Sequence, residues 1–179
     1  MRYIALLRGI NVGGKNKVPM VELKQCFESL GFENVVTYIN SGNVLFSDTA
    51  SNVASLIDRC ERAIETAFGF KAVCSVIAAK DLEDAVAHAP TWWGLKDDDK
   101  HNAIFVIPPA TAGEIMKEIG EAKPEYEKVA SHGTVIFWTA AFDTFSRTRY
   151  SKIVGTSAYA SVTIRNANTT KKLVELSRV

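Results

Sequence analysis

The chain has 179 residues, 47% of them hydrophobic and 23% charged, which is the composition of a globular protein with one domain or two small ones. Its 21 basic and 20 acidic residues give a net charge of +1, so no overall field attracts the protein to nucleic acid or to an anionic membrane. The first apolar segment is too short for a signal peptide and no apolar run reaches membrane-spanning length, so we expect a cytoplasmic protein.

The first half of the chain alternates short apolar runs with helical patterns. Residues 3–7, 35–39, 44–47 and 72–77 are predicted strands. A helix opens at Pro19 and stops at Gly31, and a longer helix from Val53 stops at Gly69, because glycine tolerates the left-handed conformation that ends many helices. Residues 40–43 predict a hairpin turn. The order βαββαβ is that of a ferredoxin-like fold.

The second half repeats this order after a connecting region. A short helix over 81–88 and a loop over 91–100 lead to predicted strands at 103–107, 126–130, 134–139 and 160–164. Two helices lie between them, one capped by Thr111 and one over 148–154, and a last helix closes the chain. The sequence therefore predicts an α+β protein with two ferredoxin-like units and antiparallel sheets, at 1–78 and 101–179, joined by a helix and loop at 79–100.

The stretch LLRGINVGGKNKVP at residues 6–19 raises the question of a phosphate-binding loop. Residues 9–15 have the spacing G-x-x-x-x-G-K of a P-loop, whose backbone N–H groups surround phosphate oxygens. However, Asn16 stands where the Ser or Thr that holds magnesium is required, and Pro19 delays the following helix. We therefore expect that this loop does not hydrolyse ATP.

Topology brings this loop to the first hairpin turn, because a right-handed crossover makes the first two strands parallel and sets both segments at one sheet edge. The polar and glycine residues expected there predict an anion-binding or amide-recognising site, with turn geometry alone as the alternative. The residues of this first predicted cluster are Arg8, Asn11, Gly13, Gly14, Lys15, Asn16, Ser41 and Asn43.

A second predicted cluster comes from the same topology in the second unit. The loop entering its second helix is expected to face the exit of its last strand, where a helix N-terminus favours anions. A solvated helix face, internal ion pairs or a simple helix cap are the alternatives. The residues of this second predicted cluster are Arg147, Arg149, Lys152, Arg165, Asn166, Asn168 and Thr169.

Other chemistry is sparse. Cys26, Cys60 and Cys74 are odd in number and lie in apolar patterns, which predicts reduced core thiols. The three histidines lack partners at metal-ligand spacing in the sequence, so we predict no metal site, and no cofactor motif or catalytic triad is present.

Four segments carry a resemblance to a known family: LLRGINVGGKNKVPM, LGFENVVTYINSGNVLF, RTRYSK and TIRNANTTKKL. With these, the chain resembles the bacterial family known as domain of unknown function 1697. The resemblance implies a cytosolic α+β protein of two ferredoxin-like parts and brings no established reaction, ligand or catalytic residue. The family pattern includes Arg8, Gly9, Asn11, Gly13, Gly14, Lys15, Ser41, Gly42, Asn43, Arg165, Asn166 and Thr169.

Together these features predict a protein that binds a phosphate-bearing ligand, either a nucleotide or a nucleic-acid backbone, at loop 8–17 and turn 40–43. Two alternatives stay open. The protein is an interaction or scaffold module without a small ligand, or an enzyme that acts on a small carboxylate substrate held by Arg8 and Lys15. The sequence leaves the oligomeric state undecided.

Overall fold

The structure, a computed structural model, describes residues 1–95 and 98–178. The chain divides into two compact units, Asp81–Lys172 and a first unit that combines Met1–Lys80 with the end of the chain from Leu173 on. Residues 96–97, in the predicted connecting loop, lie outside the described residues. None of the helices within the described ranges combines the length and apolar character that crossing a bilayer requires.

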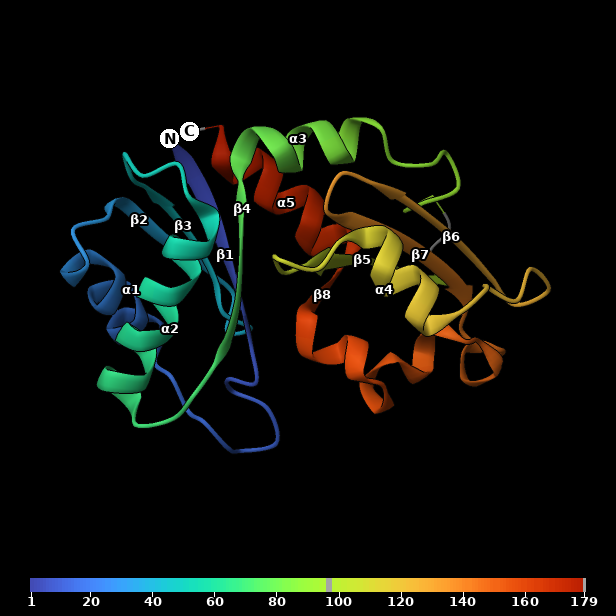
Figure 1. Cartoon of the computed structure of the whole chain (residues 1–179), viewed down its shortest axis with the longest axis horizontal. Helices are drawn as coiled ribbons and strands as arrows, with labels where there is room; N and C mark the ends of the chain where they lie inside the picture. Colours follow the sequence, from blue (N-terminus) through green and yellow to red (C-terminus); the bar gives the residue numbers. More distant parts are fainter. Residues whose placement is uncertain (96–97, 179) are drawn as a thin grey trace. The chain divides into compact units, whose positions relative to one another are not determined.

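The first unit is built on a four-stranded antiparallel sheet with the strand order β2-β3-β1-β4 (Figure 1). Its elements are β1 (Arg2–Arg8), α1 (Met20–Ser29), β2 (Glu33–Tyr38), β3 (Asn43–Ser47), α2 (Val53–Phe68) and β4 (Val73–Ala78). The first strand therefore lies inside the sheet, between the third and the fourth.

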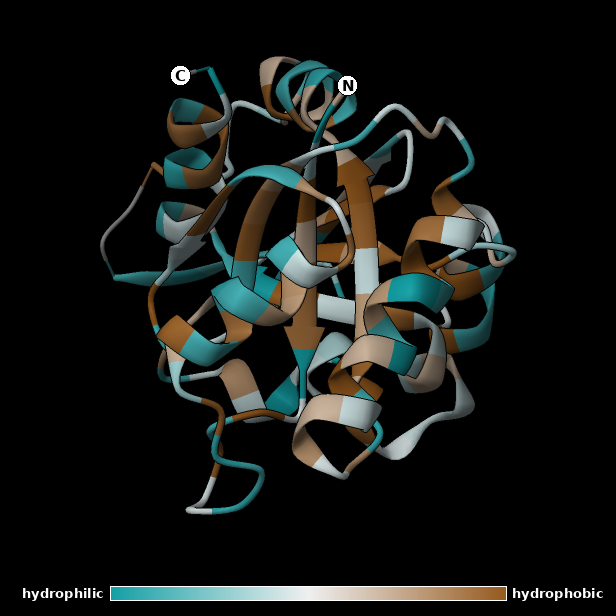
Figure 2. Cartoon of the chain, turned by 90° about the vertical axis from the view of Figure 1, so that its left-hand side faces the viewer, coloured by the Kyte–Doolittle hydropathy of each residue, from teal (hydrophilic) through white to brown (hydrophobic). Residues whose placement is uncertain are grey.

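Burial follows the sequence pattern that predicted these elements. The interior residues of β1 are all buried, as its uninterrupted apolar run requires, and α1 buries the stripe Leu23, Cys26 and Phe27. In α2, the Asn52 side chain caps the start by accepting a 3.0 Å hydrogen bond from the Ser55 N–H, and Gly69 ends the helix at φ 75°. Figure 2 shows hydrophobic residues along the strands and mixed residues along the helices.

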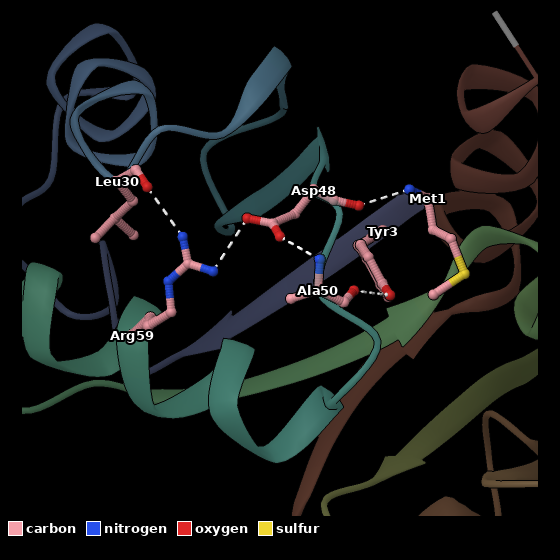
Figure 3. A network of polar contacts seen from close by, with 6 residues as sticks. All are labelled: Met1, Tyr3, Leu30, Asp48, Ala50 and Arg59. Carbon is pink, nitrogen blue, oxygen red and sulfur yellow. Dashed lines mark hydrogen bonds and ion pairs between the residues drawn. The ribbon is translucent and has the colours of Figure 1, made fainter.

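A polar network joins the segments around β1 (Figure 3). The Arg59 guanidinium of α2 donates to the Asp48 carboxylate at 3.0 Å and to the Leu30 carbonyl at 2.9 Å, and it lies 4.5 Å from the centre of the Phe32 ring. Because its planar group serves a carboxylate, a carbonyl and a ring at once, arginine suits this position better than lysine. The network ties α2 to the end of α1 and to the segment after β3.

The second unit repeats the sheet, with the strand order β6-β7-β5-β8 and antiparallel neighbours throughout. Its elements are α3 (Ala79–Ala87, of which the last seven residues belong to this unit), β5 (Asp99–Val106), α4 (Ala112–Ile119), β6 (Glu127–His132), β7 (Val135–Ala141), the 3₁₀ helices η1 (Phe145–Arg147), η2 (Tyr150–Gly155) and η3 (Ser157–Ser161), β8 (Val162–Asn166) and the first part of α5 (Ala167–Ser177). Helix α4 has the predicted capping box between Thr111 and Glu114.

The second crossover of this unit differs from the prediction. The α-helix expected over 148–154 is wrong, because the crossover consists of three short 3₁₀ helices, of which η2 covers most of this range. Hydroxyl groups stabilise its tight turns: Thr148 Oγ1 donates to the Phe145 carbonyl and Thr156 Oγ1 to the Ile153 carbonyl, each at 2.7 Å. Such local bonds from side chain to backbone compete with an α-helix.

A buried carboxylate fixes where this segment begins. Glu127, at the start of β6, is only 4% exposed and accepts hydrogen bonds from the backbone N–H groups of Lys123 at 3.1 Å, Arg149 at 2.7 Å and Tyr150 at 3.2 Å. A buried charge is tolerated when hydrogen bonds satisfy it. Glu127 therefore holds the start of η2 against β6.

We predict that Gly42→Ala destabilises the fold by about 2–4 kcal/mol, through backbone strain and overpacking together. Gly42 has φ 78°, and an added Cβ would lie 2.6 Å from Ile10 Cδ1 and 2.8 Å from Leu7 Cβ. Gly14→Ala is the matched control, because Gly14 has φ 74° with no other atom within 4 Å of that Cβ. Denaturant unfolding measures both variants, and equal losses would contradict the predicted clash.

We also predict that stability falls between pH 10 and 12 because of Tyr150. Burial, followed by repulsion from the Glu127 carboxylate, raises the pKa of Tyr150 to about 12. An unfolded tyrosine loses its proton near pH 10, so over this interval the unfolded chain binds fewer protons than the folded one and stability decreases as pH rises. The slope from this group approaches about 1.4 kcal/mol per pH unit.

Denaturant unfolding across this pH interval tests the Tyr150 prediction against Tyr150→Phe. The variant should lose that part of the slope, whereas other groups that titrate at high pH affect both proteins equally. Identical slopes in the two proteins would show that the phenol of Tyr150 does not carry the effect.

Candidate functional site

The two segments of the first predicted cluster do meet. The Leu7 N–H donates to the Gly42 carbonyl at 2.8 Å, and Asn11 Nδ2 donates to the Asn40 carbonyl at 2.9 Å. Asn43 pairs with Leu6 across β1 and β3. The loop after β1 and the turn between β2 and β3 thus share one edge of the sheet, as the topology predicts.

Within this cluster the asparagines hold the loop's own backbone. The Asn11 side chain accepts from the Val18 N–H at 2.8 Å and donates to the Val18 carbonyl at 3.0 Å, and Asn16 Nδ2 donates to the Gly9 carbonyl at 2.8 Å. Buried Asn43 donates to the Tyr38 carbonyl and to Ser41 Oγ, both at 3.0 Å. These amides serve the turn geometry, which was the alternative interpretation of the sequence.

The glycines of the loop form a small hairpin. Val12 and Lys15 are bridged, with the Lys15 N–H donating to the Val12 carbonyl at 3.1 Å, and Gly13 and Gly14 lie between them at φ 59° and 74°. A P-loop instead passes directly from its glycines into a helix whose N-terminus faces the phosphates. Lys15 and Lys17 are exposed on this hairpin, and Arg8 is half-buried at the end of β1.

The second predicted cluster divides into three groups. Arg147, Arg149 and Lys152 lie on or beside η1 and η2, where the Arg147 guanidinium is 5.8 Å from the Tyr126 ring centre. Arg165, in contrast, is only 9% exposed on β8, and its Nη1 donates to the Ile164 carbonyl at 2.9 Å.

The remaining residues of the second cluster begin α5. The Asn166 side chain accepts a 2.8 Å hydrogen bond from the Thr169 N–H, and the Thr170 hydroxyl donates to the Asn166 carbonyl at 2.9 Å. Asn166 is therefore a helix cap, which was one of the alternative interpretations of this cluster. This leaves Asn168 exposed on the first turn of the helix.

A cavity of about 360 Å³ in the second unit adjoins this helix start. Four segments meet there: the loop after α3, the beginning of β5, the turn after β7 and the junction of β8 with α5. The lining residues are Gly94, Asp99, Lys100, His101, Asn102, Phe142, Asn166, Ala167 and Asn168. Of the second predicted cluster, Asn166 and Asn168 line the cavity, and the three cations at 147–152 do not.

Strand pairing explains why these residues come together. The beginning of β5 pairs with the end of β8, with Asn102 opposite Asn166, and with the end of β7, with Asp99 opposite Ala141. In an antiparallel sheet the start of one strand meets the ends of its neighbours. Lys100 and His101 were missed by the sequence analysis, although the predicted strand order contained the signal that places them beside Asn166.

The polar groups of the cavity are held by defined contacts. The Lys100 ammonium lies 3.9 Å from the Phe145 ring centre and 5.3 Å from that of Phe142, which are cation–π distances. His101 Nδ1 is 2.8 Å from Thr139 Oγ1. Asp99 adds a carboxylate beside these groups, so the cavity offers both a cation and an acceptor.

The loop after α3 is anchored to this site. The buried Trp93 donates from Nε1 to the Asn102 carbonyl at 2.9 Å and packs edge-on against Phe137 at 4.9 Å. From α5, Lys171 Nζ donates to the Gly94 carbonyl at 3.3 Å. Trp93 therefore has a packing role in this unit.

A separate group of metal-binding residue types also converges in the second unit. Asp84, His88 and His132 bring one carboxylate and two imidazoles within 4.8 Å of one another. The spacing of Asp84 and His88, four residues apart on a predicted helix, was a usable signal, because such residues share one helix face. The sequence did not indicate that His132, 48 residues after Asp84, joins them.

Comparison with known proteins places the chain in a family. The family described as "Protein of unknown function (DUF1697)" matches residues 1–137. A solved structure of a conserved bacterial protein, SP0830 from Streptococcus pneumoniae, is 31% identical, with a TM-score of 0.88 over 99% of this chain and 98% of that one. No curated protein matches. On the family match and this full-length structural similarity, the chain belongs to the DUF1697 family of proteins of unknown function.

Proposed function

We propose that the protein binds a small phosphate-bearing ligand, such as a nucleotide, in the cavity at the start of α5. The observation that carries this proposal is the meeting of Lys100 with the first turn of α5 around a space of about 360 Å³. Ligand pockets in proteins are of this order, roughly 300–1,000 Å³. The proposal keeps the ligand class predicted from the sequence and moves its site from the first unit to the second.

Two features of the cavity favour an anion. The first backbone N–H groups of a helix have no carbonyl partners within the helix, and the helix dipole adds positive charge there. Ala167 and Asn168 bring this end of α5 to the cavity wall. The ammonium of Lys100 rests on aromatic faces, which stabilise a cation without cancelling its charge.

The other lining groups favour a ligand larger than inorganic phosphate. Asp99 and Asn102 offer acceptors for the hydroxyl groups of a sugar or the amino group of a base. Phe142 is 58% exposed beside the cavity, and an exposed ring is a platform on which a base can stack. These groups support a nucleotide over a simple phosphate or carboxylate.

The first predicted cluster supports binding less well. Its asparagine side chains already hold backbone groups of the loop and turn, so fewer donors remain for a ligand. Lys15 and Lys17 remain as exposed cations, which suits weak attraction of an anion more than a built site.

We interpret each unit as ferredoxin-like, and the element order and the internal position of the first strand support this.

We place the protein in the cytoplasm, which is supported by three buried cysteines that are free thiols.

A thermal-shift experiment tests the proposed site. ATP, ADP, GTP, inorganic phosphate, short RNA and a dicarboxylate are added separately to the intact protein. A ligand that binds only the folded state raises the melting temperature, and at a hundredfold excess over Kd the expected rise is about 5–10 °C. We predict this rise for at least one nucleotide, with a smaller rise for phosphate.

Two variants locate the binding. Asn168→Asp places a negative charge at the cavity, where it should repel the phosphate and remove most of the melting-temperature shift. The substitution should not destabilise the fold, because an acidic residue is favourable at a helix N-terminus. Lys15→Ala is the matched control on the exposed hairpin and should leave the shift unchanged. If only Lys15→Ala loses the shift, the ligand binds at the first predicted cluster and not in the cavity. If no compound shifts the melting temperature of the wild type, the scaffold interpretation is favoured.

A further inference from the structure

The second unit contains a second group of polar side chains, distinct from the cavity. Asp84 lies on α3, His88 directly follows the last residue of that helix, and His132 is the last residue of β6. His132 pairs with Val135 at one end of β7, whereas Asp99 of the cavity pairs with Ala141 at the other end. The two ends of this strand are about 20 Å apart, so the two sites are independent.

The geometry of the group centres on the Asp84 carboxylate. His132 Nε2 donates to Asp84 Oδ2 at 2.7 Å, and His88 Nδ1 lies 3.3 Å from Asp84 Oδ1. The two imidazole rings are parallel within 3°, with centroids 4.4 Å apart. The two rings therefore lie side by side, and each places one nitrogen next to the Asp84 carboxylate.

These separations suit metal coordination. Ligands about 2.1 Å from a tetrahedral zinc ion are about 3.4 Å from one another. The three donor atoms all lie within 4.8 Å, and the approach of His88 to Asp84 already has that spacing. A metal ion binds the lone pair of an imidazole nitrogen, so each coordinating nitrogen must be free of its proton. His132 Nε2 would give up its hydrogen bond to Asp84 Oδ2. His88 Nδ1 would give up its 2.9 Å contact with the Asp84 carbonyl.

The chemistry of the group narrows the choice of ion. Two imidazole nitrogens and one carboxylate oxygen favour zinc, nickel or copper over magnesium or calcium, which prefer oxygen ligands. The side chains are 58%, 58% and 36% exposed for Asp84, His88 and His132, which leaves room for water as a further ligand.

We propose that Asp84, His88 and His132 form a binding site for a divalent transition-metal ion such as Zn²⁺, with water completing the coordination. The ion joins α3 to the hairpin of β6 and β7, two segments far apart in the sequence. An ion that binds three groups held together only in the folded state also stabilises that state.

Isothermal titration of the full chain with Zn²⁺, Ni²⁺ and, separately, Mg²⁺ tests the site. We expect one Zn²⁺ or Ni²⁺ per chain and no measurable Mg²⁺ binding. His88→Gln and His132→Gln should each weaken Zn²⁺ binding by more than about tenfold, because each removes one of three protein ligands. His101→Gln is the matched control, because His101 is the one histidine of the sequence outside this group and lines the cavity instead. The Zn²⁺ affinity of this variant should equal that of the wild type.

A measurement on the wild type alone locates the ion without reliance on variants. Paramagnetic Ni²⁺ should broaden the amide resonances around Asp84, His88 and Gly133 first and leave those around Asp99 and Phe142, near the opposite end of β7, sharper. No Zn²⁺ or Ni²⁺ binding up to millimolar concentration, binding unchanged in the His88→Gln, His132→Gln double variant, or broadening centred elsewhere would each overturn the proposal. Then the group is a hydrogen-bonded contact between α3 and β6.

Discussion

The interior position of the first strand in each sheet is the constraint on which the rest of the structure depends. A strand inside a sheet must hydrogen-bond on both edges, so β5 is paired with β7 on one side and β8 on the other. Antiparallel pairing then brings the start of β5 to the ends of both neighbours. The cavity wall of Lys100, Phe142 and Asn166 follows from this register, although these residues are spread over 67 sequence positions.

The same constraint in the first unit brought together a group of residues with a different role. The loop after β1 meets the turn before β3, yet Asn11, Asn16 and Asn43 use their amides on nearby backbone groups. Turns with positive φ leave backbone N–H and carbonyl groups without regular partners, and asparagine can satisfy them locally. A polar, glycine-rich motif can therefore be explained by the needs of its own backbone, and proximity to a second polar segment does not by itself make a binding site.

Much of the fold could be predicted because it depends on local patterns. The strands and helices of the first unit follow apolar periodicity, and Gly31 and Gly69 lie at the helix ends that the sequence indicated. The crossover at 148–154 could not be predicted in the same way. Its apolar spacing fits a helix, but the N–H groups of Arg149 and Tyr150 bind Glu127, more than 20 residues earlier, and threonine hydroxyls close the tight turns.

By itself, the sequence determined the order of the strands, the meeting of the first loop with the first hairpin turn, and the family resemblance. Those depend on periodicity, glycine positions and strand connection rules, all of which act over short distances or through topology. Tertiary structure alone decided which polar side chains are used internally and which face a cavity. It also brought His132 to Asp84 and His88, because the partners of a side chain are set by packing between segments that local sequence patterns do not relate.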